Sequence, residues 1–188
     1  MKVAPARQYT STIQPQNGTG PYNPNNKIII NIPTSPNTVL VPSESYFKFN
    51  IDGIIAAVGT ATNFIRLDKP GAHGCIQRVR VTHGSTLIED IDNYGALVAM
   101  LMPLQQTTDS FSGKLNILAG TTSATVSNFG EVLPQTVGER LNQAYAAVAI
   151  NTVIPDRTYA LNLVSYIGSL SGSQYIPLFE MTSAPLTL

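Results

Sequence analysis

Residues 67–104 restrict the possible folds of this chain more than any other segment. A Gly-rich turn leads into a strand-like run, a tight turn at His83-Gly84-Ser85 and a second strand-like run that ends in Glu89-Asp90. An amphipathic helical pattern follows directly. This order predicts a β-hairpin that runs into a helix. Because the rest of the chain is typical of short strands and loops, we expect the helix to be an insertion in an all-β domain.

The helix is predicted over about residues 91–102. Its apolar face consists of five residues at helical spacing, namely Ile91, Tyr94, Leu97, Val98 and Leu101. Asp90 is expected to cap the first turn, and Asp92 suits the positive end of the helix dipole. Pro103 is expected to end the helix, because proline has no backbone N–H to donate.

Short β-forming segments separated by Pro, Gly and Asn make up most of the chain. The clearest is residues 46–52, where Phe47, Phe49 and Ile51 alternate with polar residues, a pattern typical of a sheet with one buried face. We expect these three residues to share a core with Val79 and Val81. The other predicted strands are residues 28–32, 38–41, 64–67, 75–83, 86–89, 112–118, 124–126, 144–153, 159–164 and 175–179. Such a series favours an antiparallel sandwich or barrel, with residues 119–143 mostly a long loop.

The chain has 188 residues, which suits one domain, and only 12% of them are charged, about half of the usual fraction. Neutral polar groups are less costly to desolvate than ions, so such a surface suits a protein that packs against copies of itself. A secreted β domain with a neutral surface also fits. The formal net charge is zero, and Lys and Arg cluster only at Arg78 and Arg80, which share one face of a strand. This argues against a nucleic-acid-binding surface.

Residues 1–26 are predicted to be an extended or disordered arm, because they are rich in Pro and polar residues and poor in apolar ones. Residues 27–188 are predicted to form the domain. We do not expect the N-terminal residues to be a signal peptide, because no apolar run follows Lys2 and Arg7, and we find no run of about 20 apolar residues that could span a membrane. Asn17-Gly18-Thr19 fits the N-glycosylation pattern, which we attribute to chance in a chain of cytosolic or nuclear type.

Two groups of residues bear functional chemistry. His73, Cys75 and His83 could form a zinc site or a cysteine–histidine pair, but His83 lies beyond the strand that would align the other two. Turn-capping histidines and a packed thiol are the preferred interpretation. Glu89 joins Asp90 and Asp92 in an acidic cluster that helix capping explains better than a Ca²⁺ site. We therefore predict no catalytic, cofactor-binding or metal-binding residues, no cofactor and no enzymatic activity.

Several ordered segments together resemble the major capsid proteins of double-jelly-roll DNA viruses, the polinton-like and related eukaryotic viruses. They are an aromatic strand at 46–53, a basic strand at 76–81 with its His83-Gly84 turn, the sequence Glu89-Asp90-Ile91-Asp92-Asn93-Tyr94, and segments 163–165 and 175–178. The resemblance implies an antiparallel eight-stranded jelly-roll sandwich. It further implies a self-assembling subunit of an icosahedral shell, with a trimeric capsomer and other capsid proteins as partners. Such a protein is found in the virion and is assembled in the host cytoplasm or nucleus.

The chain is shorter than that family's proteins, because it has room for one jelly roll. A complete single jelly roll, such as a penton or minor capsid protein, is one possibility. We predict instead the first jelly roll of a longer chain, since residues 182–188 stop within an apolar/polar alternation. The alternative function is a receptor- or carbohydrate-binding β-sandwich of the fibre or lectin kind. The absence of Trp weakens that alternative, because sugar rings commonly stack on Trp or Tyr faces.

Overall fold

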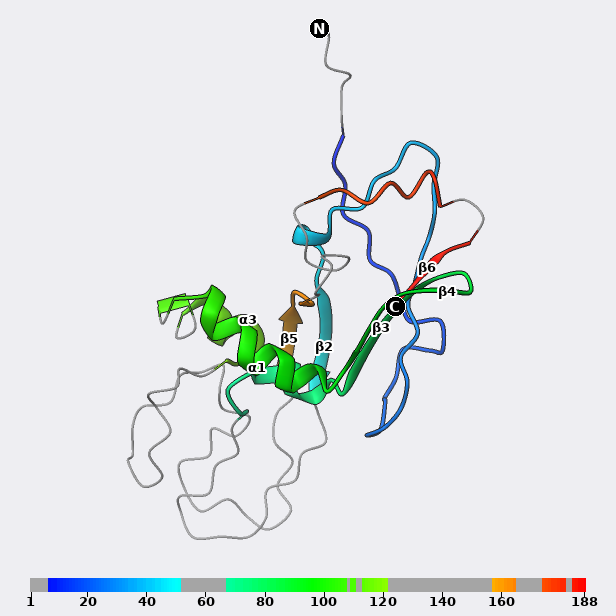
Figure 1. The fold of residues 1–188 in the computed structure, drawn as a ribbon. Coiled ribbons are helices and arrows are strands. Elements are labelled where there is room, and N and C mark those ends of the chain that lie inside the picture. The colour runs from blue at the N-terminus through cyan, green and yellow to red at the C-terminus, as the bar shows by residue number, and fades with distance from the viewer. Residues whose placement is uncertain are drawn as a thin grey trace, which may run out of the picture.

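The computed structural model describes residues 7–51, 67–107, 109–110, 113–121, 157–164, 174–181 and 184–188. Its elements, in chain order, are β1 (Asn31–Ile32), η1 (Pro42–Glu44), β2 (Phe47–Ile51), η2 (Gly71–Cys75), β3 (Arg78–His83), β4 (Thr86–Asp92), α1 (Tyr94–Gln105), α3 (Lys114–Ala119), β5 (Arg157–Leu161) and β6 (Leu186–Thr187). Figure 1 shows the two α-helices at one end of these elements and β6 beside the β3–β4 hairpin at the other.

The described strands form two antiparallel sheets. One has the order β1-β6-β3-β4, and the other pairs β2 with β5. The two-residue strand β6 connects the first sheet, because Thr187 lies opposite both Asn31 in β1 and Thr82 in β3. The described chain is therefore mostly β, as predicted, with two antiparallel sheets and two α-helices. Its described strands do not close into a jelly roll.

The β3–β4 hairpin forms where the sequence predicts it, although β4 continues to Asp92 instead of ending at 89. A β-bulge shifts the register between Val81 and Thr82, just before the turn. Strand alternation directs Val79, Val81 and Ile91 inward and leaves Arg78 and Arg80 outside. The hairpin thereby supplies one apolar face to the core and one charged face to the surface.

The core consists of two hydrophobic clusters. The first gathers Val79 and Ile91 with residues of α1, and the second gathers residues around Tyr159 and Leu161 of β5. Of the five predicted core residues, Val79 and Val81 are buried. Phe47, Phe49 and Ile51 are half-buried and pack at the margins of the clusters, Phe47 on the first and the other two on the second. The predicted alternation is confirmed over residues 47–51, but its apolar face is only partly covered.

The predicted bounds of the helix were wrong at both ends. Ile91 and Asp92 remain in β4, paired with β3, so the helix begins at Tyr94 after Asn93, which adopts a left-handed conformation (φ 53°). Pro103 lies inside the last turn instead of ending the helix, which continues to Gln105. At Ile91 the pairing of β4 with β3 overrides the helical periodicity. The spacing of apolar residues in the sequence does not reveal this pairing.

The predicted strand at 112–118 is also wrong, because residues 114–119 form α3. Gly120 ends this helix in a left-handed conformation, and its N–H donates to the Asn116 carbonyl oxygen, as in a common helix C-cap. Leu115 packs against the first core cluster, and Ala119 belongs to the second. The short apolar run is compatible with either structure by sequence, and its packing selects the helix.

Other predicted strands are reduced in the structure. Segments 28–32, 38–41 and 175–179 retain only β1 and an isolated bridge between Leu40 and Ile176, while β5 spans 157–161 instead of 159–164. The predicted strands at 124–126 and 144–153, nearly all of 64–67 and most of the loop at 119–143 lie outside the described residues.

In the predicted arm, residues 7–26 contain turns but no helix or strand. Its side chains contact the domain at two places: Gln8 donates to Glu44, and Gln16 and Asn17 bond to residues 27–31.

Candidate interaction surface

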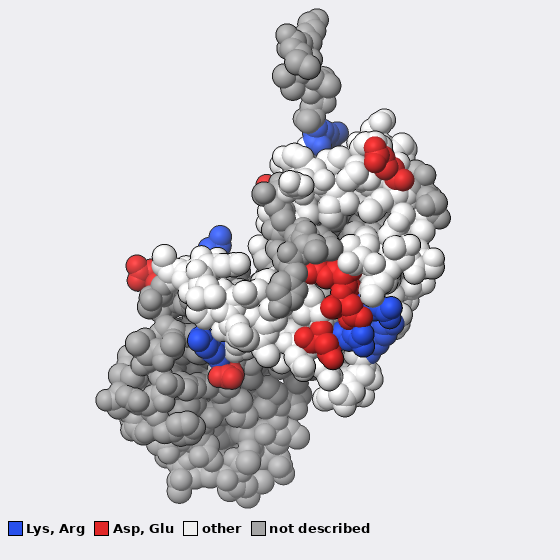
Figure 2. Space-filling view, viewed as in Figure 1, with Lys and Arg blue, Asp and Glu red and all other residues white. Residues whose placement is uncertain are grey.

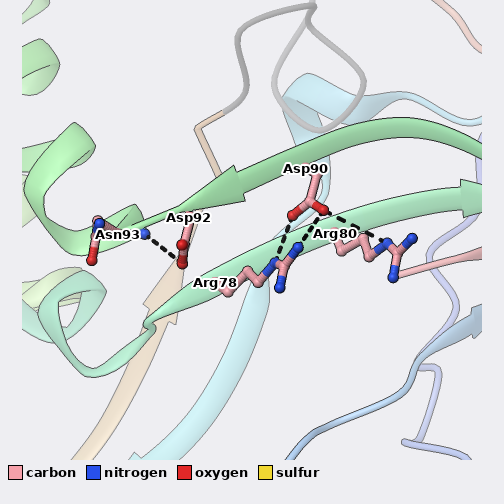
Figure 3. Close-up of polar contacts among 5 residues, drawn as sticks. All are labelled: Arg78, Arg80, Asp90, Asp92 and Asn93. Carbon is pink, nitrogen blue, oxygen red and sulfur yellow. Dashed lines mark hydrogen bonds and ion pairs between the residues drawn. The ribbon is translucent and has the colours of Figure 1, made fainter.

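The outer face of the β3–β4 hairpin carries a compact group of charges. Asp90 accepts two hydrogen bonds from Arg78, from Nε at 2.7 Å and from Nη2 at 2.5 Å, and Arg80 Nε lies 3.8 Å from Oδ2 of the same carboxylate (Figure 3). The predicted common face of the two arginines is therefore confirmed. The bond with Arg78 lowers the pKa of Asp90, and the pKa of Arg78 is raised in return.

The acidic cluster does not cap the helix, so that prediction was wrong. Asp90 is occupied by the arginines, and Asp92 instead accepts from the backbone N–H of Asn93 at 3.1 Å (Figure 3). Glu89 points to the opposite, buried face of the hairpin. No acidic residue lies in the first turn of α1. Strand alternation therefore separates three neighbouring acids into different environments.

His73 and Tyr94 form a buried polar contact between η2 and α1. The Val164 backbone N–H donates to the Tyr94 hydroxyl at 2.7 Å, and the same hydroxyl lies 3.4 Å from His73 Nδ1. Burial lowers the pKa of His73 from 6.5 to about 4, and burial is also the main cause that raises the pKa of Tyr94 to about 12. Both groups are neutral near pH 7, which suits a structural contact between three segments.

The three residues considered for zinc binding or nucleophilic catalysis lie in different environments. His73 is buried, Cys75 is exposed, and His83 is at the far end of β3, where its Nε2 is shielded and has no hydrogen-bond partner in the described part of the chain. Partial desolvation of the exposed residue Cys75 raises the pKa of its thiol, whereas an activated nucleophile would have a lowered pKa. Within the described ranges, no three His, Cys, Asp or Glu residues are placed to hold a metal ion.

Glycines bring η2 unusually close to both helices. A Cβ on Gly71 would lie 2.1 Å from the carbonyl oxygen of Ala119 at the end of α3, and Gly71 has a positive φ of 62°. A Cβ on Gly95 in α1 would lie 3.0 Å from Gly74 Cα. We call η2, α1 and α3 the helical corner. At Gly71 the backbones pack at a distance that only glycine permits, and at Gly95 the contact is tighter than most side chains make.

The outer side of the helical corner exposes large apolar side chains. Met100 and Leu104, one turn apart on α1, are 72% and 83% exposed, and Ile117 on α3 is 70% exposed. Tyr94, Val98 and Met102 occupy the buried side of α1. Sequence reasoning missed the exposed side because it sought a single apolar stripe. The available indication was that residues 94–105 contain no charged residue at all, so the helix is apolar around its whole circumference.

A second set of exposed apolar residues flanks the Leu40–Ile176 bridge. Val39, Tyr175 and Phe179 are exposed, and Phe179 N–H donates to the Thr38 carbonyl oxygen; Tyr46, just before β2, is exposed as well. Figure 2 shows that the charges on this face gather mainly at the hairpin, while much of the remaining described surface in that view is uncharged. The described surface thus combines a charged group on the hairpin with exposed apolar positions on α1, on α3 and around the Leu40–Ile176 bridge.

The chain matches no protein-family model, and neither a curated protein nor a solved structure is significantly similar to it. No helix among the described residues is long and apolar enough to cross a membrane.

Proposed function

We propose that this protein is a structural subunit of a viral capsid that assembles with copies of itself. The observation that carries the proposal is the apolar character of α1 on both of its sides. Its inner side packs in the core through Tyr94, Val98 and Met102, while Met100 and Leu104 stay exposed in the single chain. An apolar pair on a regular helix in a weakly charged protein suits burial against another protein surface.

The finer assignment rests on the order of sequence segments that resembles double-jelly-roll capsid proteins. Under it, the antiparallel sheets belong to an eight-stranded jelly roll, the first of two in a longer chain, and three such chains form a capsomer of an icosahedral DNA virus. The protein is then a virion component that acts with other capsid proteins. Its partners are proteins and not nucleic acid, because Arg78, one of only two clustered arginines, is already paired with Asp90.

The proposal is tested by replacing Met100 and Leu104 with Gln, which keeps helix propensity and removes the apolar surface. The wild-type chain should form concentration-dependent oligomers in light scattering and regular particles or tiles in electron microscopy. The double variant should keep its unfolding midpoint within a few degrees, because both positions are exposed, and should lose most of the association.

Leu87→Gln is the matched control. Leu87 is also an exposed apolar residue, but it lies on β4 near the tip of the hairpin, away from the helical corner. It should associate like the wild type. A wild-type chain that stays monomeric at all concentrations and forms no particles would overturn the proposal. If the double variant and Leu87→Gln lose the same amount of association, α1 is not the specific site of the interface.

The exposed tyrosines favour a second candidate, a carbohydrate- or receptor-binding β domain. Tyr9, Tyr46 and Tyr175 are each more than half exposed, and tyrosine faces stack on sugar rings. A glycan array probed with the monomeric double variant separates the two functions. Saturable binding that is lost in Tyr46→Ala or Tyr175→Ala would favour the second candidate.

A further inference from the structure

Asn17 holds the N-terminal arm against the segment that leads into β1. Its Nδ2 donates to the Lys27 carbonyl oxygen at 2.5 Å, and its Oδ1 accepts from the Ile29 N–H at 3.0 Å and from the Tyr22 hydroxyl at 3.4 Å. The Gln16 N–H donates to the Ile29 carbonyl oxygen at 2.7 Å beside it. One amide side chain therefore joins three positions of the loop that connects the arm to the sheet.

The residue after Asn17 is Gly18, and this is the only Asn-Gly pair in the chain. Glycine carries no side chain beside its peptide nitrogen, and the space where a Cβ of Gly18 would lie holds no atom within 4 Å. Asn17 is itself exposed. An unhindered backbone nitrogen next to an exposed asparagine amide is the arrangement that favours cyclisation of the side chain onto the main chain.

We propose that Asn17 is a deamidation site, and that its conversion releases the arm from residues 27–31. The Gly18 nitrogen attacks Cγ of Asn17 and loses its proton, the Cγ–Nδ2 bond breaks, and ammonia leaves. Water then opens the cyclic imide at either carbonyl and yields aspartate or isoaspartate. Water is the only co-reactant, and no oxidant or reductant takes part. The proposal is independent of the capsid function.

Release follows from what the product lacks. Aspartate has no donor for the Lys27 carbonyl, so two acceptor oxygens would face each other where the amide now donates at 2.5 Å. Isoaspartate additionally lengthens the main chain by one carbon and displaces the side chain from Ile29. The existing hydrogen bonds oppose cyclisation, because Nδ2 and Oδ1 are held by partners on the other side of the loop. The hydrogen bonds that hold the arm therefore slow deamidation of Asn17. Once deamidation has occurred, the same hydrogen bonds cannot form again, and the arm stays released.

The first experiment ages the full chain at mildly alkaline pH and locates deamidation by tandem mass spectrometry. Asn23, Asn25 and Asn26 in the same loop are internal references. Asn23 precedes Pro24, which has no N–H, and the other two precede residues with side chains. Asn17 should convert fastest of the four. Conversion no faster than at Asn25 or Asn26 would overturn the assignment of the site.

The second experiment compares Asn17→Asp with Asn23→Asp by hydrogen exchange. Asn23 is exposed and its side chain makes no hydrogen bond within the described residues, so its variant adds the same charge without removing a contact. The amides of Gln16 and Ile29 should exchange about tenfold faster in Asn17→Asp and unchanged in Asn23→Asp. Equal exchange in the two variants would overturn release of the arm.

Discussion

The helical corner and the strands near the chain ends are held together in different ways. In the helical corner, η2 packs closely against both helices, at a glycine-only distance where Gly71 meets the end of α3, and His73 and Tyr94 are buried against each other. At the ends, β1 and β6 have two residues each and connect Asn31 with Thr187, 156 positions apart. We call β1 and β6, with the flanking Ile30 and Leu188, the terminal sheet. The Ile30 and Leu188 backbones exchange two hydrogen bonds of 2.9 Å.

The difference shows two ways in which one chain holds its segments together. Where segments are close in sequence, small residues allow close backbone packing, and a few large side chains fill the core. Where segments are distant, backbone pairing and one buried side chain, Leu186, provide the connection. The helical corner should therefore be sensitive to added volume, and the terminal sheet to lost apolar surface.

The largest effect is expected from Gly71→Ala. The new Cβ would meet the backbone of Ala119 and Gly120, and alanine is strained at the positive φ. We expect destabilisation of about 4 kcal/mol in urea unfolding, from overpacking and backbone strain together. Gly18→Ala is the control, because Gly18 also has a positive φ but its Cβ would be in open space. If Gly71→Ala and Gly18→Ala lose the same stability, close backbone packing is not what makes the helical corner sensitive to added volume.

Acidification should weaken the helical corner through His73. Its pKa is lowered in the folded protein, so the unfolded chain binds the proton more tightly, and stability falls as the pH drops from about 6.5 towards 4. The shift corresponds to a loss of about 3 kcal/mol, complete below pH 4. Because carboxylates titrate in the same range, the measured quantity is the difference from His73→Gln across pH 7 to 4. Parallel pH profiles for the two proteins would contradict this prediction.

Leu186→Ala tests the terminal sheet. Leu186 is 1% exposed and pairs with both Ile32 and His83, so its truncation should destabilise the protein by about 2 to 3 kcal/mol. In this variant, amide hydrogen exchange should be accelerated more at Ile30 and Leu188 than in α1. Leu87→Ala, at an exposed leucine, is the control and should change stability by less than about 0.5 kcal/mol. Uniform acceleration in both regions would show that the terminal sheet is not a separate unit.

The smallest effects concern one polar contact in each region. Tyr94→Phe leaves the partly buried Val164 N–H without its acceptor, the hydroxyl of the fully buried Tyr94, and should destabilise the protein by about 1 to 2 kcal/mol. Thr187→Val removes the partly buried hydrogen bond from Thr187 Oγ1 to Asn31 Oδ1, and should have an effect of about 0.5 kcal/mol or less. Thermal unfolding of both variants measures the difference. Equal losses of stability in the two variants would mean that the burial of the Tyr94 hydroxyl does not make its contact stronger than the one at Thr187.

Sequence patterns located the hairpin, the aromatic strand and the presence of a helix after residue 90, because each depends on local periodicity. Alternation was sufficient to place Arg78 and Arg80 together and Val79 and Val81 inside. Local patterns failed at residues 91 and 92, where pairing with β3 competes with helix formation, and at 114–119, where the apolar run is too short to select a structure. The capping role expected for Asp90 failed for the same reason, since its partner is across the hairpin.

The sequence by itself determined a mostly β chain with one charged strand face, a helix after residue 90 and a polar arm, because side-chain periodicity and composition are local properties. Only the tertiary structure decided that α1 exposes Met100 and Leu104, that Gly71 contacts the end of α3, and that β6 joins β1 to β3. These features depend on which distant segments meet. Such meetings are selected by the burial and backbone pairing of the whole chain, and no short window of residues contains that information.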